Sequence, residues 1–228
     1  MDTTAQAPFT IAASQPVSQV LYFAYGSNMR EEQMYDRCPN SVIAGMGRLK
    51  GYRWIINTRG YANIVDTEAT RSGKQPYDVP YTHIDECVYG MVYLIAPDDE
   101  ARLDVYEGVP FAYTKEIMTA EFWPTGPPDP TPADPAKKRD VLVYIDRNRT
   151  SSGFPQHEYI DRMNQGIHDL EEMGSPLGYT KDVLRQRIPL DRNFDYSVET
   201  KPRETRGVPA KEEVLVKEAL PTTEWGET

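Results

Sequence analysis

The chain alternates between short apolar runs and polar, turn-forming segments, a pattern typical of a protein rich in β-strands. The first apolar run is rich in aromatic residues and ends at Ala24, where the sequence Tyr-Gly-Ser-Asn follows directly. Further runs predict strands over residues 41–50, 52–57, 62–65, 84–95, 113–123 and 141–145. Helical spacing and helix start signals predict helices over residues 30–37, 97–107, 156–173 and 177–187. About six or seven strands with a few helices indicate a mixed α+β domain.

Glycine, proline and polar residues mark the irregular parts of this pattern. A glycine within residues 41–50 predicts a β-bulge, and Gly90 predicts a bend or a close approach by backbone or ligand. Residues 67–82 form a predicted loop, and the proline-rich segment 124–135 is interpreted as an exposed hairpin extension. We expect residues 1–18 to be a flexible tail, residues 19–189 to be one domain, and residues 190–228 to be a largely disordered tail.

Charge and hydropathy narrow the classes of partner. The 228 residues contain 25 Lys+Arg against 35 Asp+Glu, a net charge of −10. This balance argues against non-specific binding to nucleic acid or to an anionic membrane surface, because both require a basic face. No apolar run approaches the roughly 20 residues that span a bilayer, and residues 1–18 lack the pattern of a signal peptide. The expected partner is a small molecule, the expected location is cytoplasmic, and a monomer and a homodimer are both compatible with the sequence.

The cysteines and histidines do not predict a metal centre. Cys38 and Cys87 form no CxxC motif and are interpreted as reduced thiols of a cytosolic protein. His83, His157 and His168 have no spacing typical of metal ligands. We therefore expect neither a metal nor another cofactor.

The turn after the first strand is the first candidate for a binding site. Gly26 can adopt backbone angles that a side chain forbids, and Ser27 and Asn28 are natural N-cap residues for the helix that follows. An exposed helix start presents N–H groups that suit a carboxylate. On these residues alone, however, an ordinary strand–turn–helix junction is the simpler interpretation.

A second segment changes that interpretation. Residues 103–113, Leu-Asp-Val-Tyr-Glu-Gly-Val-Pro-Phe-Ala-Tyr, place Glu107 before a glycine and Tyr113 six residues later. Together with the Tyr-Gly-Ser-Asn loop, this segment resembles the γ-glutamylcyclotransferase family over roughly residues 20–189. The resemblance implies a small, closed or nearly closed β-barrel flanked by helices. It also implies that the protein releases 5-oxoproline from a γ-glutamyl amino acid, glutathione or a glutathione conjugate.

The same resemblance implies roles for particular residues. Glu107 matches the family's catalytic glutamate, which acts as general acid and base. Its apolar and aromatic neighbours in the sequence would raise its pKa, and a surface glutamate at a helix C-terminus is the alternative. Tyr113 matches a tyrosine that contacts this glutamate or the substrate, and a plain core tyrosine is the alternative. The family's substrate loop matches Tyr25, Gly26, Ser27, Asn28 and Met29.

One position departs from the family pattern and leaves the substrate open. Where some members have a substrate-binding tyrosine after the last barrel strand, this chain has Arg149. Either the leaving group carries its own carboxylate, as in glutathione, or Arg149 is a solvated loop charge. A γ-glutamylamine cyclotransferase and a non-catalytic binding module are alternative functions, although the presence of Glu107 disfavours the module. A role in secondary metabolism, trimming a glutathione adduct, would use the same residues.

Overall fold

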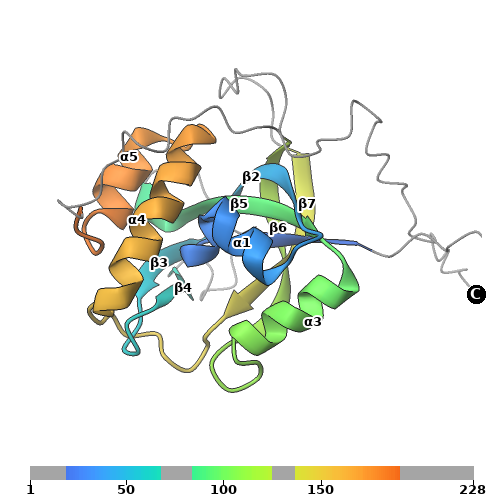
Figure 1. Cartoon of the computed structure of the whole chain (residues 1–228). Coiled ribbons are helices and arrows are strands. Elements are labelled where there is room, and N and C mark those ends of the chain that lie inside the picture. The colour runs from blue at the N-terminus through green and yellow to red at the C-terminus, as the bar shows by residue number, and fades with distance from the viewer. Residues whose placement is uncertain (1–18, 68–83, 125–136, 191–228) are drawn as a thin grey trace, which may run out of the picture. The chain divides into compact units, whose positions relative to one another are not determined.

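Five strands close into a β-barrel at the centre of the part of the chain that the structure describes (Figure 1). The computed structural model describes residues 19–67, 84–124 and 137–190, all within one compact unit. Antiparallel pairing joins neighbouring strands, except that β1 and β7 are parallel and meet at Tyr22 and Leu142. In barrel order the strands are β1 (Val20–Ala24), β5 (Cys87–Ile95), β2 (Val42–Lys50), β6 (Thr114–Pro124) and β7 (Lys137–Ile145). The predicted small mixed barrel with flanking helices is confirmed.

A second, two-stranded sheet is formed by β3 (Tyr52–Ile56) and β4 (Ala62–Asp66), which pair antiparallel. The Trp54 indole N–H donates to the carbonyl of Tyr25 at 2.9 Å, directly after β1. A β-bridge between Asn57 and Ser152 joins the turn of this sheet to the segment that follows β7. The small sheet therefore helps to fix the position of the turn at the end of β1.

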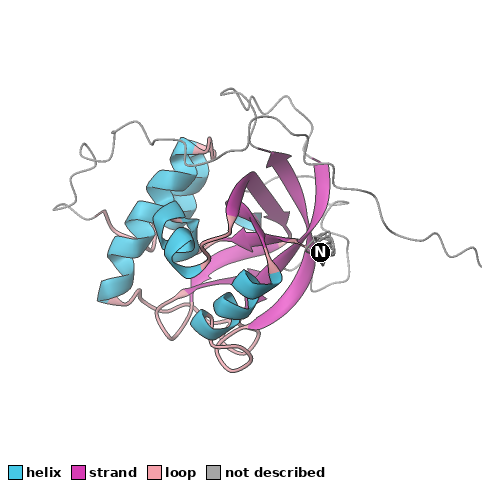
Figure 2. Cartoon of the chain, turned by 45° about the vertical axis from the view of Figure 1, so that its right-hand side comes forward, coloured by secondary structure: helices cyan, strands magenta, loops and turns pink. Residues whose placement is uncertain are grey.

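Helices lie around the barrel on more than one side. Figure 1 shows α4 (His157–Glu172) and α5 (Leu177–Tyr179) together, with α3 (Pro97–Tyr106) in a different place beside the strands. The short helix α1 (Glu31–Arg37) follows η1, a 3-10 turn over Ser27–Met29. Figure 2 shows the strands in magenta with helices, in cyan, beside and in front of them. None of the helices in the described ranges has the length and apolar character needed to span a bilayer.

Three predicted elements differ from those observed by more than one residue at an end. Residues 84–86 form a 3-10 turn, and the strand begins only at Cys87. Strand β7 begins at Lys137 because its polar residues continue the ladder with β6 beyond the barrel core, where Lys137 lies opposite Phe122. The last predicted helix is divided into α5 and a π-helical turn, Thr180–Leu184. The predictions for residues 1–18, 68–83, 125–136 and 191–228 lie outside the described residues.

Both predicted glycine irregularities are present in the barrel. A register shift between Ile43 and Gly45 is the bulge of β2. A Cβ atom at Gly90 would lie 2.3 Å from the carbonyl oxygen of Ala24, so only glycine allows β5 to approach β1 this closely. This approach sets the point at which the chain leaves β1 and begins the candidate loop.

Candidate active site

A cavity of about 310 Å³ lies beside the end of β1. Its wall is formed by the turn after β1, the C-terminal ends of α1 and α3, the β3–β4 turn and one face of α4. The fold thus brings together segments that are far apart in the sequence. Six of the predicted site residues line the cavity: Tyr25, Gly26, Ser27, Asn28, Glu107 and Tyr113.

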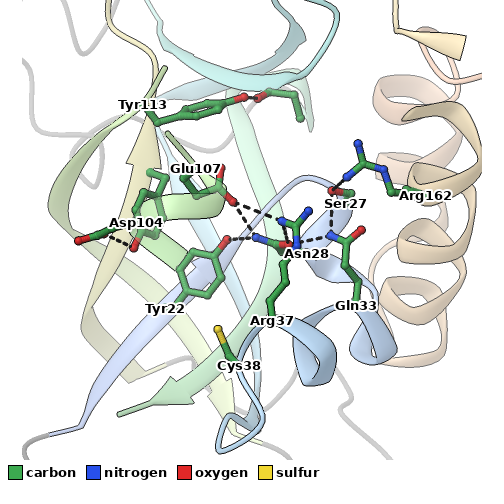
Figure 3. Close-up of polar contacts among 12 residues, drawn as sticks. Tyr22, Ser27, Asn28, Gln33, Arg37, Cys38, Asp104, Glu107, Tyr113 and Arg162 are labelled. Carbon is green, nitrogen blue, oxygen red and sulfur yellow. Dashed lines mark hydrogen bonds and ion pairs between the residues drawn. The ribbon is translucent and has the colours of Figure 1, made fainter. Parts of the chain in front are cut away.

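Glu107 reaches the cavity because α3 ends at this residue. Glu107 is the C-cap, and Gly108 follows in the left-handed region at φ +63°. The Gly108 N–H bonds to the carbonyl of Val105, and a side chain at position 108 would be strained in this conformation. The Glu107 side chain is only 16% exposed and points toward Asn28 of the loop (Figure 3). Gly108 therefore ends the helix at the point where the Glu107 side chain enters the cavity.

Asn28 holds the Glu107 carboxylate in a fixed orientation. Its Nδ2 donates to Glu107 Oε1 at 2.9 Å and to the hydroxyl oxygen of Tyr22 at 2.9 Å. Its Oδ1 accepts hydrogen bonds from Gln33 Nε2 and Arg37 Nη1, both at 2.8 Å. Because the Gln33 amide and the Arg37 guanidinium both donate to Oδ1, the Nδ2 group of Asn28 is the one that faces Glu107. Figure 3 shows this network, which joins α1, β1 and the end of α3.

The surroundings of Glu107 shift the pKa of its carboxyl. Burial raises the pKa of its carboxyl, whereas Arg37 at 3.8 Å and the Asn28 hydrogen bond oppose that rise, with smaller opposing effects from Arg59 and Arg162. The net effect is a raised pKa. No donor among the described residues binds Oε2, the second carboxylate oxygen. A carboxyl that is anchored through one oxygen can accept a proton and return it through the other.

Space, rather than backbone angle, requires glycine at position 26. Gly26 has φ −122°, outside the left-handed region, so the prediction that it adopts angles forbidden to side chains is wrong. A Cβ atom there would lie 2.8 Å from the hydroxyl oxygen of Tyr159 and 3.2 Å from Cβ of Ala62. Glycine is needed because α4 and β4 pack so closely against the loop that a side chain has no room.

The predicted N-cap role of Ser27 and Asn28 is also wrong. Helix α1 begins at Glu31, whose N–H donates to Asp169 Oδ2 at 2.9 Å. The Ser27 hydroxyl instead accepts hydrogen bonds from Gln33 at 3.0 Å and from an arginine of α4 at 3.3 Å. A carboxylate of α4 therefore already occupies this helix start. The N–H groups of Gly26 and Asn28 meet no acceptor within the described ranges.

Tyr159 on α4 was missed by the sequence analysis, although its hydroxyl oxygen lies at the centre of the loop. It accepts hydrogen bonds from the N–H groups of Ser27 at 3.2 Å and Ala62 at 3.4 Å. Burial raises the pKa of Tyr159 to about 12, and the two backbone hydrogen bonds oppose that rise. The phenol therefore keeps its proton at neutral pH. Helical spacing places Tyr159 on the buried face of α4, but only the fold brings that face to the loop.

Tyr25 and Tyr113 line the cavity, and each donates its hydroxyl proton to a backbone carbonyl. The Tyr113 hydroxyl binds the carbonyl of Ala62 at 2.8 Å, and the Tyr25 hydroxyl binds that of Tyr144. Burial raises both pKa values well above the ordinary value, so both groups stay protonated. In this state Tyr113 does not hydrogen-bond Glu107.

Two predicted residues lie outside the cavity wall. The Met29 side chain is fully buried in the core, and its carbonyl accepts a hydrogen bond from Tyr93 at 3.2 Å. The Arg149 guanidinium binds the buried carboxylate of Asp146 at 3.0 Å. The position that departs from the family pattern therefore forms a local ion pair after β7.

Three arginines in the cavity wall were not predicted. They come from α1, the β3–β4 turn and α4, so no local motif in the sequence connects them. Arg162 extends from α4 to the hydroxyl of Ser27 (Figure 3) and pairs with Glu158 at 2.8 Å. The wall also contains Arg37 and Arg59. A basic cavity in a chain with a net charge of −10 suits an anionic ligand.

One group of possible metal ligands is present in the described ranges. His168, Asp169 and Glu172 place one ligand atom each within 4.8 Å of one another. None of the three lines the cavity, and Asp169 already binds the start of α1. The group is thus separate from the candidate active site.

Comparisons with known proteins identify a family and similar folds. The family described as gamma-glutamyl cyclotransferase, AIG2-like, matches residues 22–160. Two solved structures, an uncharacterized Homo sapiens protein (loc79017) and a protein titled gamma-glutamyl cyclotransferase, each have a TM-score of 0.56 and 22% identity. The match covers 78% of this chain in both cases, and 92% and 93% of those chains.

A third solved structure, YkqA from Bacillus subtilis, has a TM-score of 0.53 and 18% identity. The match covers 75% of this chain and 55% of that one. No curated protein gave a significant match. These structural likenesses concern the fold, whereas the family match spans more than half of the sequence and includes the loop and Glu107. The chain belongs to the gamma-glutamyl cyclotransferase, AIG2-like family.

Proposed function

We propose that this protein is a γ-glutamylcyclotransferase in which Glu107 acts as general acid and base. The observation that carries the proposal is the Glu107 carboxyl, which is buried in a cavity, anchored through one oxygen by Asn28 and raised in pKa by burial. Membership of the family supports the reaction type. The substrate is a γ-glutamyl amino acid, glutathione or a glutathione conjugate.

The loop after β1 is the proposed site for the α-carboxylate of the substrate. Two of its N–H groups, those of Gly26 and Asn28, have no acceptor in the described part of the chain. Arg162 reaches the same loop through the Ser27 hydroxyl and adds positive charge. Backbone N–H groups and a guanidinium together favour a carboxylate, because each donates to it without a large change in geometry.

In the proposed reaction the substrate's own α-amine attacks its γ-carbonyl carbon. Glu107 removes a proton from the α-ammonium, and the new C–N bond closes the five-membered ring. Glu107 returns this proton to the departing nitrogen as the amide C–N bond breaks. The ring nitrogen loses its second proton to the released amine, giving 5-oxoproline and a protonated amine. Since nucleophile and electrophile belong to one molecule, holding the folded conformer supplies much of the rate enhancement.

The Tyr159 hydroxyl is proposed as a donor within the site. Its oxygen already accepts two backbone hydrogen bonds, so its proton is directed away from the loop backbone. A neutral phenol beside the reacting carbonyl would stabilise the oxyanion that forms during ring closure. This role uses the tyrosine in the protonated state that its raised pKa maintains.

A substrate panel tests the proposed function. The purified full-length chain is incubated with a γ-glutamyl amino acid, glutathione, a glutathione S-conjugate and a γ-glutamylalkylamine, and 5-oxoproline is measured. We expect product from one or more of the first three. Product from the alkylamine alone would instead identify a γ-glutamylamine cyclotransferase. Binding of these compounds without any product would identify a non-catalytic module and contradict the proposal.

A cytoplasmic location is proposed on the state of the two thiols. Cys38 and Cys87 are both buried, neither forms a disulfide bond, and burial raises the pKa of the Cys38 thiol to about 12. Thiols of this kind are poorly reactive and persist in a reducing compartment. Localisation of the tagged full-length chain in its own cells checks this point.

A further inference from the structure

Positive charges outnumber negative ones in the wall of the cavity. Among the described residues that line it, three are arginines and one, Glu107, is a carboxylate. Arg37 lies 3.8 Å from Glu107, and Arg162 lies 2.8 Å from Glu158 on its own helix. Arg59 differs from both, because no carboxylate of the described residues lies within about 4 Å of its guanidinium.

The Arg59 guanidinium is nevertheless held in a defined place. Its Cζ lies 5.5 Å from the ring centroid of Tyr61 and 5.1 Å from that of Tyr113. The backbone of Arg59 is fixed as well: its N–H donates to Asn57 Oδ1 at 3.0 Å, and its carbonyl accepts a hydrogen bond from Gln156 Nε2 at 2.9 Å. Aromatic contacts and a fixed backbone reduce the entropy that a ligand would otherwise lose on ordering this side chain.

Aromatic rings lie between Arg59 and Arg162, the two arginines that we place at the rim of the cavity because both are partly exposed. The rings of Tyr61 and Tyr159 pack edge to face with centroids 5.1 Å apart. Arg162 lies over Tyr159 and reaches the loop, whereas Arg59 lies over Tyr61 and Tyr113. The cavity thus offers two distinct cationic positions, one beside the loop and one beside Tyr113.

We propose that Arg59 binds a carboxylate of the leaving group and so selects γ-glutamyl amino acids or peptides over γ-glutamylalkylamines. This inference rests on the proposed cyclotransferase function. The γ-glutamyl part of the substrate carries one carboxylate and one ammonium, which the loop and Glu107 accommodate. A second carboxylate on the leaving amine supplies the negative charge that Arg59 lacks among the described residues.

The test compares two ligands that differ in one charge, γ-glutamylglycine and γ-glutamylglycinamide. The variant Arg59→Met removes the guanidinium but keeps an unbranched stem over the rings of Tyr61 and Tyr113. Arg53→Met is the matched control, because it lowers the net charge equally at an exposed position of β3 outside the cavity. Release of 5-oxoproline is measured for turnover, and calorimetric binding is measured in a Glu107→Gln background.

We expect the parent chain to prefer the carboxylate ligand, and Arg59→Met to lower kcat/KM for it by about 10- to 100-fold, the range of a charge-assisted hydrogen bond. Turnover of the amide should change by less than about threefold. Arg53→Met should leave both rates unchanged. Equal losses for the two ligands would show that Arg59 binds the α-carboxylate common to both, and no loss for either would show a packing role. Both results overturn the proposal.

The binding measurement shows whether the Arg59 proposal or the proposed cyclotransferase function has failed. If neither ligand yields 5-oxoproline but the carboxylate binds more tightly and Arg59→Met abolishes the difference, the cyclotransferase proposal fails and the Arg59 subsite stands. If both ligands react equally well in all variants, the reaction stands and the subsite is wrong. Absence of both binding and turnover contradicts both proposals.

Discussion

The inner end of the cavity and its rim both carry arginine and tyrosine, but they are built in different ways. At the inner end, Glu107, Asn28 and Arg37 bond to one another and are largely buried. At the rim, Arg59 and Arg162 lie over aromatic rings and are partly exposed. The inner groups have protein partners that fix one geometry, whereas Arg59 at the rim has no carboxylate partner among the described residues.

This difference separates the chemical step from the choice of substrate. A proton-transfer group must stand in one place, because small displacements reduce the rate steeply. A recognition group can tolerate more exposure, since its role is to complement the charge of the ligand. Variants at the inner end should therefore change turnover, and variants at the rim should change the ranking of substrates.

The largest effect is expected at the inner end, for Glu107→Gln. The amide keeps the shape and can still accept a hydrogen bond from Asn28, but it cannot take or return the proton. General acid–base catalysis commonly contributes about 10²–10⁴ in rate, so kcat for 5-oxoproline release should fall by at least that order. Direct binding of a γ-glutamyl ligand should persist, because the α-carboxylate is assigned to the loop.

The two measurements on this variant have separate meanings. Turnover within a few-fold of the parent would show that another group is the base. Loss of binding together with turnover would show that Glu107 holds the ammonium of the substrate, and the binding-module interpretation would gain support.

A smaller effect, on KM, is expected from Gly26→Ala. The new Cβ would collide with the Tyr159 hydroxyl, which binds the Ser27 N–H, and would displace the loop whose N–H groups are assigned to the α-carboxylate. A loss of about 1.4 kcal/mol in ligand binding corresponds to a tenfold rise in KM, which is the order we expect. Overpacking should also lower the free energy of unfolding by about 1–3 kcal/mol.

Gly47→Ala is the matched control for Gly26→Ala. Its Cβ would lie 2.9 Å from Val92 Cγ2 and 3.0 Å from the Phe23 ring, inside the barrel and outside the cavity wall. Both variants should lose stability in urea unfolding, and only Gly26→Ala should raise KM. A parallel rise in both would mean that general loosening of the barrel, rather than the loop, changes binding.

Sequence reasoning succeeded where one segment carries the whole signal. Alternation of apolar residues located the strands, and the Tyr-Gly-Ser-Asn loop and the Glu-Gly pair mark the ends of a strand and of a helix. The predicted closeness of Glu107 and the loop came from the family resemblance, because the two are 79 residues apart in the chain. Their contact at 2.9 Å depends on closure of the barrel.

The missed residues share a physical cause. Tyr159 is one of several apolar or aromatic residues on the buried face of α4, and its hydroxyl acquires a role only through two N–H groups of distant segments. Asp169 replaces the predicted N-cap in the same way, from a helix 138 residues away. Arg59 and Arg162 look like ordinary surface charges in the sequence, because a cavity formed by several elements has no one-dimensional pattern.

The smallest expected effect is on stability and returns to the inner end of the cavity. Burial raises the pKa of Glu107 above its ordinary value of 4.5. Between the unfolded pKa and the higher folded pKa, the folded chain holds more protons than the unfolded chain, so this group's contribution to stability decreases as the pH rises. Glu107→Gln removes that dependence, since glutamine does not titrate.

The free energy of unfolding of Glu107→Gln relative to the parent should therefore increase from about pH 4 to about pH 7. Urea unfolding of both chains at several pH values measures this difference. Glu171→Gln makes the same chemical change on α4, outside the cavity wall, and corrects for the altered net charge. A relative stability that decreases with pH would mean that Arg37 and Asn28 outweigh burial, so that Glu107 is held as a carboxylate in an ion pair. In that case the inner end would hold a charged carboxylate paired with Arg37. It would then differ from the rim only because its arginine has a carboxylate partner and Arg59 has none among the described residues.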